Sequence, residues 1–373
     1  MASNDAAWMR EKKSELTVGP APYALPQNNQ ILIKNHAVAI NPLDWIIQCA
    51  GGLTYRWLKY PTILGSDISG EVVEVGSKVK TFKVGDRVIA HAVGSDKDSN
   101  NPAEGGFQNY TAVLEQMACL IPDFLPYESA AVLPLGLSTA ACALYQSDLL
   151  GLELPSSSAV SLGRTVLIWG GSSSVGSNAI QLAKASGYEV YTTASPKNFE
   201  YVLSLGAARA FDYRAPNVNE EIIDALQGRD VAGAIAIGET GAASCVKIIR
   251  KCSGNKFVAI TTPPVSFAEL SDSNHSRFKK TKFVARLIGS NIKLQLDARS
   301  AGVGVKYIFG TTLKSNGIAE AIYGDFLPQA LSEARYVAAP PAKVVGEGLE
   351  DIQKAIRLQQ SGVSAEKVVV KIT

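Results

Sequence analysis

The sequence predicts an α/β protein with two domains, a compact antiparallel β-barrel followed by a doubly wound parallel sheet. Its 373 residues exceed what a single hydrophobic core usually organises. Before residue 125, short runs rich in Val and Ile are separated by glycine, proline and aspartate, which indicates antiparallel strands. From about Glu128 onward, helical and strand-like patterns alternate, which is typical of a parallel sheet covered by helices.

The β-barrel is predicted from strand-like runs and from the turn chemistry between them. The runs are residues 31–34, 70–75, 87–90 and 108–113. Residues 83–86 predict a turn between an exposed and a buried strand. Near the end of the chain, residues 349–360 predict an amphipathic helix, and a last strand over 367–372 has the length to return to the first domain. We therefore expect residues 1–128 and 311–373 in one domain and residues 129–310 in the other.

Residues 164–195 predict a strand, a turn, an amphipathic helix and a second strand. The turn from Gly170 to Gly176 lets backbone N–H groups approach an anion at the start of the helix, and Gly187 ends that helix. Gly171, Ser173 and Gly176 occupy the frame of the dinucleotide fingerprint, with serine in place of the middle glycine. The segment favours a phosphate-bearing dinucleotide. A tight turn without a ligand is the alternative.

The residues after the second strand bear on which dinucleotide is bound. Ser195-Pro196-Lys197-Asn198 stands where NAD-specific folds place an acidic residue. Serine and lysine accept a 2′-phosphate that a carboxylate would repel, so the segment predicts NADPH rather than NADH. Lys197 as an ordinary solvated surface residue is the alternative.

Composition narrows the class of protein. The formal net charge of +2 indicates neither nucleic acid nor an anionic membrane surface as a partner. The five cysteines are scattered and lack C-x-x-C spacing, which is typical of reduced thiols and predicts a cytoplasmic location. The N-terminal stretch is polar, so we expect no signal peptide, and we expect no apolar run long enough to span a membrane.

Motifs of both predicted domains occur in the order and at the spacing that a known protein family shows. The motifs of the first domain are Asn41–Asp44, Gly65–Gly70, Val84–Val88 and Gly105–Tyr110. With the cofactor segment behind them, they resemble the medium-chain dehydrogenase/reductase superfamily over nearly the whole chain. Four further segments resemble the fungal branch of this superfamily: Gly170–Gly176, Ser195–Phe199, Phe211–Arg214 and Ser364–Val370. That branch contains trans-acting enoyl reductases of polyketide assembly and dehydrogenases similar to quinone reductases. The resemblance implies a GroES-like β-barrel catalytic domain and a Rossmann domain that binds NADPH.

The zinc site of the alcohol dehydrogenases in this superfamily is not matched. Those enzymes carry a cysteine near the position of Asp44 and Gly-His-Glu where this chain has Gly65-Ser66-Asp67. A catalytic zinc typically needs three protein ligands, mostly Cys and His. None of the three histidines, His36, His91 and His275, lies beside a cysteine or four residues from another histidine. We expect His36 and His91 to be polar residues of the barrel, and we predict no metal.

A zinc-independent site favours hydride addition to an activated acceptor. Zinc polarises the oxygen when a simple alcohol is oxidised. An enone, an enoyl thioester or a quinone instead places the developing charge on an oxygen that hydroxyl or backbone N–H donors stabilise. The α-carbon of an enoyl acceptor then needs only a positioned proton donor or water.

The resemblance assigns candidate cofactor residues position by position. Asn41–Asp44 match the loop over the nicotinamide, the turn matches the pyrophosphate site, and the residues after the later strands match the adenosine and nicotinamide neighbours. The candidates are Asn41, Pro42, Leu43, Asp44, Gly171, Ser172, Ser173, Ser174, Val175, Gly176, Ser195, Lys197, Asn198, Tyr213, Ile260, Thr261, Ser364 and Ala365.

Candidate substrate and catalytic residues follow in the same way. The substrate candidates are Leu133, Gly136, Leu137, Thr139, Tyr307, Ile308 and Phe309. The catalytic candidates are Thr139 as a hydroxyl near the nicotinamide, Tyr55 as a proton donor, and Asp44.

Structural alternatives stand beside these assignments. Asp44 is equally expected to cap a short helix, and Ser138 and Thr139 equally to open the helix that continues to Tyr145. Tyr307 and Phe309 also suit core or interface packing.

One polar loop, one basic run and one predicted edge strand bear on partners. The polar loop His91–Glu104 is expected to be a solvated hairpin tip, and the basic run Ser271–Lys282 a solvated face or a docking site for an acidic carrier domain. Alternation of Ile292, Leu294 and Leu296 with polar residues predicts an edge strand of the kind that joins two sheets in a dimer. The charged stretch Arg277–Lys293 favours a monomer over a homodimer, because it is longer and more charged than an edge that joins two sheets.

Three functions remain open from the sequence. The first is an NADPH-dependent reductase of an enone, enoyl or quinone small molecule in fungal secondary metabolism, with hydride transfer in a cleft between domains. The second is a trans-acting enoyl reductase for a chain bound to a polyketide synthase carrier domain. The third is a redirected, non-reductive or non-enzymatic role on the same scaffold.

Overall fold

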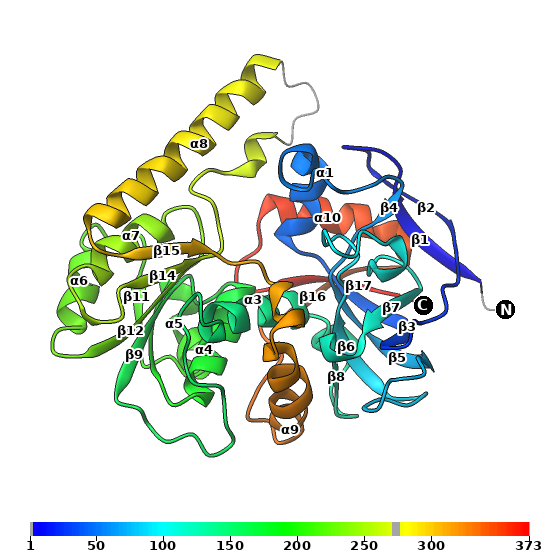
Figure 1. Cartoon of the computed structure of the whole chain (residues 1–373), viewed down its shortest axis with the longest axis horizontal. Helices are drawn as coiled ribbons and strands as arrows, with labels where there is room; N and C mark the ends of the chain where they lie inside the picture. The colour runs from blue at the N-terminus through cyan, green and yellow to red at the C-terminus, as the bar shows by residue number, and fades with distance from the viewer. Residues whose placement is uncertain (1–2, 271–276, 373) are drawn as a thin grey trace. The chain divides into compact units, whose positions relative to one another are not determined.

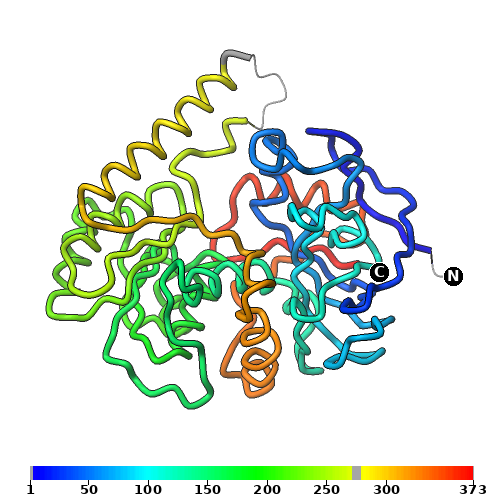
Figure 2. The backbone as a smooth tube through the Cα atoms, viewed as in Figure 1, coloured from blue at the N-terminus to red at the C-terminus, as the bar shows by residue number. Residues whose placement is uncertain are grey.

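The computed structural model describes residues 3–270 and 277–372, with the backbone alone at residues 277 and 278. The chain forms two compact units (Figures 1 and 2). The first contains Met1–Leu135 and Ala319–Thr373, and the second contains Gly136–Ile318. The basic run predicted over residues 271–282 lies outside the described residues from 271 to 276, and its remainder begins helix α8 (Arg277–Ser300).

The first unit is built on an antiparallel-rich sheet in the order β16-β17-β3-β5-β6-β8, with β7 also paired to β3. Its strands are β3 (Gln30–Ala39), β5 (Asp67–Val75), β6 (Arg87–His91), β7 (Tyr110–Leu114), β8 (Ala118–Leu120), β16 (Ala342–Glu347) and β17 (Lys367–Lys371). The predicted barrel strands are confirmed. The predicted return of the last strand is confirmed as well, because β17 pairs with β3 through Val370 and Val38.

A second, smaller sheet and four α-helices complete this unit. The sheet has the order β2-β1-β4, and its strands are β1 (Asn4–Met9), β2 (Leu16–Ala21) and β4 (Thr62–Ile63). The helices are α1 (Pro42–Thr54), α2 (Tyr127–Ala130), α9 (Leu327–Ser332) and α10 (Ile352–Ser361). The predicted amphipathic segment near residues 349–360 is confirmed as a short 3-10 turn followed by α10, which packs on α1.

The loop from His91 to Glu104 differs from a solvated hairpin tip. Its end folds back into the unit, where the buried Glu104 carboxylate accepts hydrogen bonds from Gln30 Nε2 at 2.9 Å and Ser99 Oγ at 2.6 Å. A polar composition predicted solvation, but these polar groups bond to one another and to the barrel.

The second unit is a parallel sheet in the order β11-β10-β9-β12-β14-β15, with β13 beside β12 (Figure 1). The strands are β9 (Arg164–Trp169), β10 (Glu189–Ala194), β11 (Arg209–Asp212), β12 (Asp230–Ala236), β13 (Ser253–Gly254), β14 (Phe257–Ile260) and β15 (Gly304–Tyr307). The chain runs outward from β9 in one direction and then in the other, which is the doubly wound topology that the sequence predicts.

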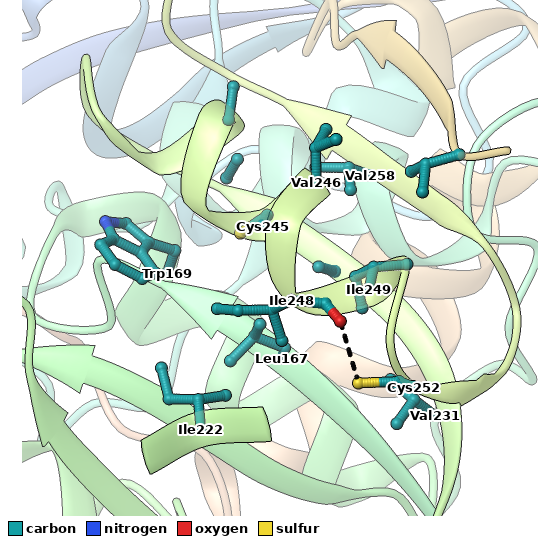
Figure 3. Close-up of a cluster of buried hydrophobic side chains, with 14 of the residues drawn as sticks. Leu167, Trp169, Ile222, Val231, Cys245, Val246, Ile248, Ile249, Cys252 and Val258 are labelled. Carbon is teal, nitrogen blue, oxygen red and sulfur yellow. Dashed lines mark hydrogen bonds between the residues drawn. The ribbon is translucent and has the colours of Figure 1, made fainter. Parts of the chain in front are cut away.

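Helices cover this sheet and enclose an apolar cluster (Figure 3). They are α3 (Pro134–Tyr145, of which residues from Gly136 belong to this unit), α4 (Ser174–Ala185), α5 (Phe199–Ser204), α6 (Val218–Ala225), α7 (Gly241–Ile249) and α8. Leu167 and Trp169 of β9 meet Ile222 of α6 and Ile248 of α7 in the cluster. Such burial contributes about 25 cal/mol per Å² of apolar surface, and it fixes the strand ends that carry the site.

The predicted edge strand around Ile292, Leu294 and Leu296 is wrong, because these residues lie in the long helix α8. Leu294 is buried against the cluster, whereas Ile292 and Leu296 are more than half exposed. Apolar residues on two faces of one helix produced an alternation that resembles a strand.

Two expectations about the segment before residue 146 are also corrected. Ser138 and Thr139 do not open a helix, because α3 already begins at Pro134, a residue suited to the first helical turn. By length and composition alone, Tyr127–Tyr145 meets the criterion for a membrane-spanning helix, contrary to the expectation that no run would. Because 78% of that stretch is buried inside the protein, it is a core segment of the fold.

Candidate functional site

The carboxyl ends of the parallel strands form one continuous row in the second unit. The pairing register places Trp169 beside Thr193 and Ala236, and it continues through Ile260 to Tyr307. On the other side, Ala194 pairs with Asp212 of β11. The residues that follow these strand ends therefore share one edge, which is where doubly wound sheets bind ligands.

The turn after β9 is held in a conformation that only glycine accommodates. Gly170 has a φ of +94°, and its N–H donates to Thr193 Oγ1 at 3.0 Å. A Cβ on Gly171 would lie 2.1 Å from Thr192 Oγ1, and one on Gly176 would lie 2.2 Å from the Gly170 carbonyl oxygen. The glycines thus allow the close approach of strand, turn and helix. Thr193, which the sequence did not single out, fixes the start of the turn.

Helix α4 begins directly behind this turn. Ser173 is its N-cap, with Oγ accepting from Gly176 N at 3.1 Å and donating to the Gly170 carbonyl at 2.8 Å. Ser173 therefore caps the helix as the middle residue of the fingerprint, and its hydroxyl is already engaged. The positive end of the helix dipole lies at this N-terminus.

Ser174 carries a buried hydroxyl at this turn whose bonding is incomplete. Its Oγ is buried and has no hydrogen-bond partner among the residues that the structure describes. Gly136 of α3 packs against it, since a Cβ there would lie 2.4 Å from Ser174 Oγ. A buried polar atom without a partner costs about 1 to 3 kcal/mol, so a phosphate oxygen that accepts from it is favoured. The turn and this hydroxyl fit the pyrophosphate of a dinucleotide.

The predicted 2′-phosphate residues follow the next two strands. Ser195 and Asn198 are largely buried, and the Asn198 N–H donates to the Ser195 carbonyl at 2.8 Å within the 3-10 turn η3 (Pro196–Asn198). Lys197 is exposed on this turn, and Tyr213, directly after β11, is 37% exposed. The residues lie at the neighbouring carboxyl ends of β10 and β11, and none of those named carries a carboxylate.

The candidates after β14 and β15 differ in what they expose. The Ile260 side chain is fully buried in the apolar cluster, whereas Thr261 Oγ1 donates to the Ala236 carbonyl at 3.1 Å. Tyr307 donates to Asn291 Oδ1 at 2.5 Å, and Phe309 is 66% exposed. Core packing therefore describes Ile260, while Phe309 presents its ring at the surface of the unit.

The remaining candidates lie in helix α3, directly before it at Leu133, and directly after β15 at Ile308. Leu133 and Leu137 are fully buried, as is Ile308 for the most part. Thr139 is 9% exposed, and Gly310 packs on it, since a Cβ there would lie 2.6 Å from Thr139 Oγ1. A role of these residues toward substrate stays a prediction.

In the first unit, Asn41 and Asp44 open helix α1. Asp44 Oδ2 accepts from the Asn41 N–H at 2.7 Å, and the Asn41 side chain accepts in return from the backbone of Asp44, which makes a capping box. Pro42 stands in the first turn of the helix. The alternative of a capping role for Asp44 is therefore confirmed.

A buried ionic cluster surrounds this helix start. Lys367 Nζ lies 2.9 Å from Asp67 Oδ2 and donates to Asn41 Oδ1 at 2.5 Å. Asp67 accepts further hydrogen bonds from Asn41 Nδ2 at 2.9 Å and from Leu135 N at 2.6 Å. Sequence reasoning named Asp67 only as part of a motif and missed Lys367. The signal was a lysine directly before the apolar run Val368–Val370 of a buried strand.

Burial governs the acidity of two catalytic candidates. It raises the pKa of Asp44 to about 7, and the Asp67 charge adds to this, against the lowering effect of the Asn41 N–H donor. Burial also raises the pKa of Tyr55 to about 12, with smaller contributions from Asp96 and Asp44. Tyr55 lies at the end of α1, where its ring meets Trp57 at 4.9 Å between centroids. At neutral pH the phenol holds its proton.

The last candidates, Ser364 and Ala365, precede β17. Ala365 has a φ of 53° and, with Ser364, leads into the strand that carries Lys367.

Within residues 3–270 and 277–372, His, Cys, Asp and Glu side chains form no group of three or more that could hold a metal ion. Of the two histidines expected to be polar barrel residues, His36 stacks on Tyr127 at 4.6 Å between ring centroids, and His91 is buried at the end of β6.

The doubly wound sheet with its glycine turn is the architecture of a dinucleotide-binding fold, here joined to a barrel unit. The family model for the alcohol dehydrogenase GroES-like domain matches residues 27–123, and that for zinc-binding dehydrogenase matches residues 174–264. The chain is 49% identical to the dehydrogenase pigH of Monascus ruber over the full length of both proteins. It is 38% identical to the trans-enoyl reductase himH of Aspergillus japonicus, over 99% of this chain and 98% of that protein.

Solved structures agree on the fold. An alcohol dehydrogenase superfamily protein from Novosphingobium aromaticivorans superposes with a TM-score of 0.71 at 23% identity, covering 99% of this chain and 100% of that chain. The chain belongs to the medium-chain dehydrogenase/reductase superfamily. It is an oxidoreductase of that superfamily, whose Rossmann unit implies a nicotinamide cofactor.

Proposed function

We propose that this chain is an NADPH-dependent reductase of an activated C=C bond, in an enone or enoyl compound, or of a quinone, in fungal secondary metabolism. The proposed cofactor is supported by the turn after β9 with its buried Ser174 hydroxyl. It is also supported by the Ser195–Asn198 turn after the neighbouring strand β10, which has no carboxylate. Ser195 and Lys197 favour the 2′-phosphate of NADPH, which an acidic residue would repel.

In the second unit, Ser172–Gly176 and the N-terminus of α4 would receive the pyrophosphate, Ser195, Lys197, Asn198 and Tyr213 the adenosine end, and Thr261 the nicotinamide half. In the first unit, Asn41–Asp44 and Ser364–Ala365 are candidates toward the nicotinamide by resemblance to the family. When bound, the reduced nicotinamide supplies a hydride equivalent.

The state of Asp67 supports an acceptor that needs no metal. It stands where zinc alcohol dehydrogenases carry the glutamate of Gly-His-Glu, and Ser66 replaces the histidine. The Asp67 carboxylate is fully buried and occupied by Lys367, Asn41 and the Leu135 N–H. This donor set holds a lysine, and it does not provide the Cys and His ligands of a catalytic zinc.

Hydroxyl groups would handle the proton and the developing negative charge. The Thr139 hydroxyl is the candidate donor to the acceptor oxygen, and the Tyr55 phenol, protonated at neutral pH, the candidate proton donor. A conjugated carbonyl or a quinone suits such donors, because its charge comes to rest on oxygen.

A second candidate is a trans-acting enoyl reductase for a chain carried on a polyketide synthase. It is favoured because three relatives, himH, tndF and tazE, are named trans-enoyl reductases. A cytoplasmic location accords with five cysteines that form no disulfide among the described residues. Monomer and homodimer both stay open.

Two measurements test the proposal. Fluorescence titration should give tight binding of NADPH and much weaker binding of NADH, and Ser195→Asp should reverse that preference by at least about tenfold. NADPH consumption should then be followed with enones, quinones and an enoyl N-acetylcysteamine thioester, and Tyr55→Phe should lower kcat without weakening NADPH binding.

The outcomes separate the alternatives. Turnover of the small acceptors supports the first function, and turnover only of a carrier-bound enoyl chain supports the second. NADPH binding without any turnover would favour a redirected role, and no binding of either nucleotide would refute the assignment of the Gly170–Gly176 turn.

A further inference from the structure

Helix α8 presents two apolar faces, and only one is used inside the second unit. On the inner face, Leu294 and Ala298 join the apolar cluster, and Phe283 meets Phe267 at 5.4 Å between ring centroids. Polar anchors hold the same face, since Asn291 accepts from Tyr307 and Arg286 pairs with Glu269. The helix is therefore fixed along its length against its own unit.

The outer face carries an apolar stripe at helical spacing. Ile288, Ile292 and Leu296 lie four residues apart and are 54%, 55% and 62% exposed. Residues four apart lie one above another on a helix, so the stripe runs about 12 Å along the axis. Gly289 lies beside it, and a Cβ there would meet nothing within 4 Å among the described residues. A ridge with a glycine notch next to it suits close approach of another helix.

The charge of α8 is strongly one-sided. Its acidic residue is Asp297, and its basic residues are Arg277, Lys279, Lys280, Lys282, Arg286, Lys293 and Arg299. Both Lys293, which lies within the span of the stripe, and Lys282, six residues before it, are exposed. An apolar ridge flanked by cations is complementary to an acidic helix that has apolar side chains of its own.

We propose that the outer face of α8 is the docking surface for an acidic, helical carrier domain, with Ile288, Ile292 and Leu296 as the apolar contact. This inference rests on the second function proposed above, the reduction of a carrier-bound chain. Long-range attraction from the basic residues steers the domain to the helix, and the stripe supplies the desolvated contact.

Other occupants fit the surface less well. Two copies of α8 brought together would place basic residues against basic residues, which opposes a second copy of this chain. A helix that lies in a membrane surface needs a broad apolar face, and this helix has already buried its inner apolar residues in the unit. The exposed stripe is one residue wide, as a protein–protein ridge requires.

The test uses the full chain and a fluorescently labelled, phosphopantetheinylated carrier domain from a fungal polyketide synthase. Fluorescence anisotropy should show binding that weakens as salt is raised. Ile292→Glu should weaken binding at least about tenfold, because it places a carboxylate at the centre of the contact. The matched control is Val160→Glu, which adds the same charge at a side chain 78% exposed elsewhere in the unit and should change binding less than about twofold.

Turnover of an enoyl N-acetylcysteamine thioester by Ile292→Glu should equal that of the wild type, which shows that folding and the reaction are intact. Because anisotropy needs no turnover, failure of docking and failure of the reductase proposal are separate results. Equal carrier binding by Ile292→Glu and wild type, or no binding by wild type, would overturn the inference. So would wild-type binding to phosphatidylserine vesicles in place of the carrier, or a dimer in sedimentation that Ile292→Glu dissociates.

Discussion

Lys367→Met removes the only cation that contacts Asp67 among the described residues of the buried cluster. The side chains of Lys367 and Asp67 are 5% and 0% exposed, so water cannot replace the lost partner. After the change, Asp67 keeps the Asn41 amide and the Leu135 N–H, and Asn41 Oδ1 loses the Lys367 donor but keeps the backbone N–H of Asp44. Methionine has a similar length, so the main effect is an unpaired buried carboxylate.

The expected loss of stability is large because removing one partner of a buried ion pair costs about 3 to 5 kcal/mol. For a unit of this size, each kcal/mol lowers the melting temperature by about 2 to 4 °C, so we expect a decrease of roughly 6 to 20 °C.

Thermal melting followed by circular dichroism measures the effect, with amide hydrogen exchange of β3 and β17 to locate it in the first unit. Lys371→Met is the matched control, because Lys371 lies in the same strand and makes a half-exposed pair with Glu128 at 3.2 Å. Exposed pairs contribute about 0 to 1 kcal/mol, so this control should shift the melting temperature by less than about 4 °C. Equal shifts in the two variants would refute the reasoning.

Three further changes test other parts of the site. Gly176→Ala places a Cβ 2.2 Å from the Gly170 carbonyl oxygen, so it should abolish measurable NADPH binding in a fluorescence titration and lower the stability of the protein. As a control, Gly289→Ala lies in a helix where a Cβ meets nothing within 4 Å among the described residues, and it should raise the free energy of unfolding in urea by up to about 1 kcal/mol. Ser174→Ala removes a buried hydroxyl without a partner among the described residues; it should weaken NADPH binding about tenfold and raise the melting temperature of the free protein, and a lowered melting temperature would contradict this. Because burial raises the pKa of Asp44 to about 7 from 3.8, the folded state retains a proton that the unfolded chain releases; this stabilisation is complete below about pH 4 and is lost as pH rises to about 7, so Asp44→Asn should flatten the stability of the first unit across that window.

The parallel sheet and the row of strand ends at its carboxyl edge were predictable because they depend on local chemistry. Strands such as Arg164–Trp169 are short apolar runs, and the glycines at 170 and 176 mark a turn that no other residue accommodates. Parallel strand ends meet at one edge by topology alone, so Ser195 and Thr261 were placed correctly without any knowledge of side-chain contacts.

The ionic cluster was not predictable for the opposite reason. Asn41, Asp67 and Lys367 come from a helix start, a strand and the chain's last strand, and only the pairing of β17 with β3 brings Lys367 near the others. A lone lysine beside an apolar run gives no indication of its partner. The sequence could indicate that the last strand returns to the barrel, but not which residue opposes which, since one residue of register reverses the face to which every side chain points.

Helix α8 shows a different limit, in which the local pattern itself was misleading. A helix that buries one stripe has an apolar period near 3.6, but α8 has Leu294 and Ala298 on one face and Ile288, Ile292 and Leu296 on another. The two stripes interleave in the sequence, so Ile292, Leu294 and Leu296 alternate as strand residues do. Burial inside one unit does not need both stripes. The second stripe exposes apolar side chains to water and contributes no burial to the folding of this unit. The proposed contact with another protein would give these side chains a role.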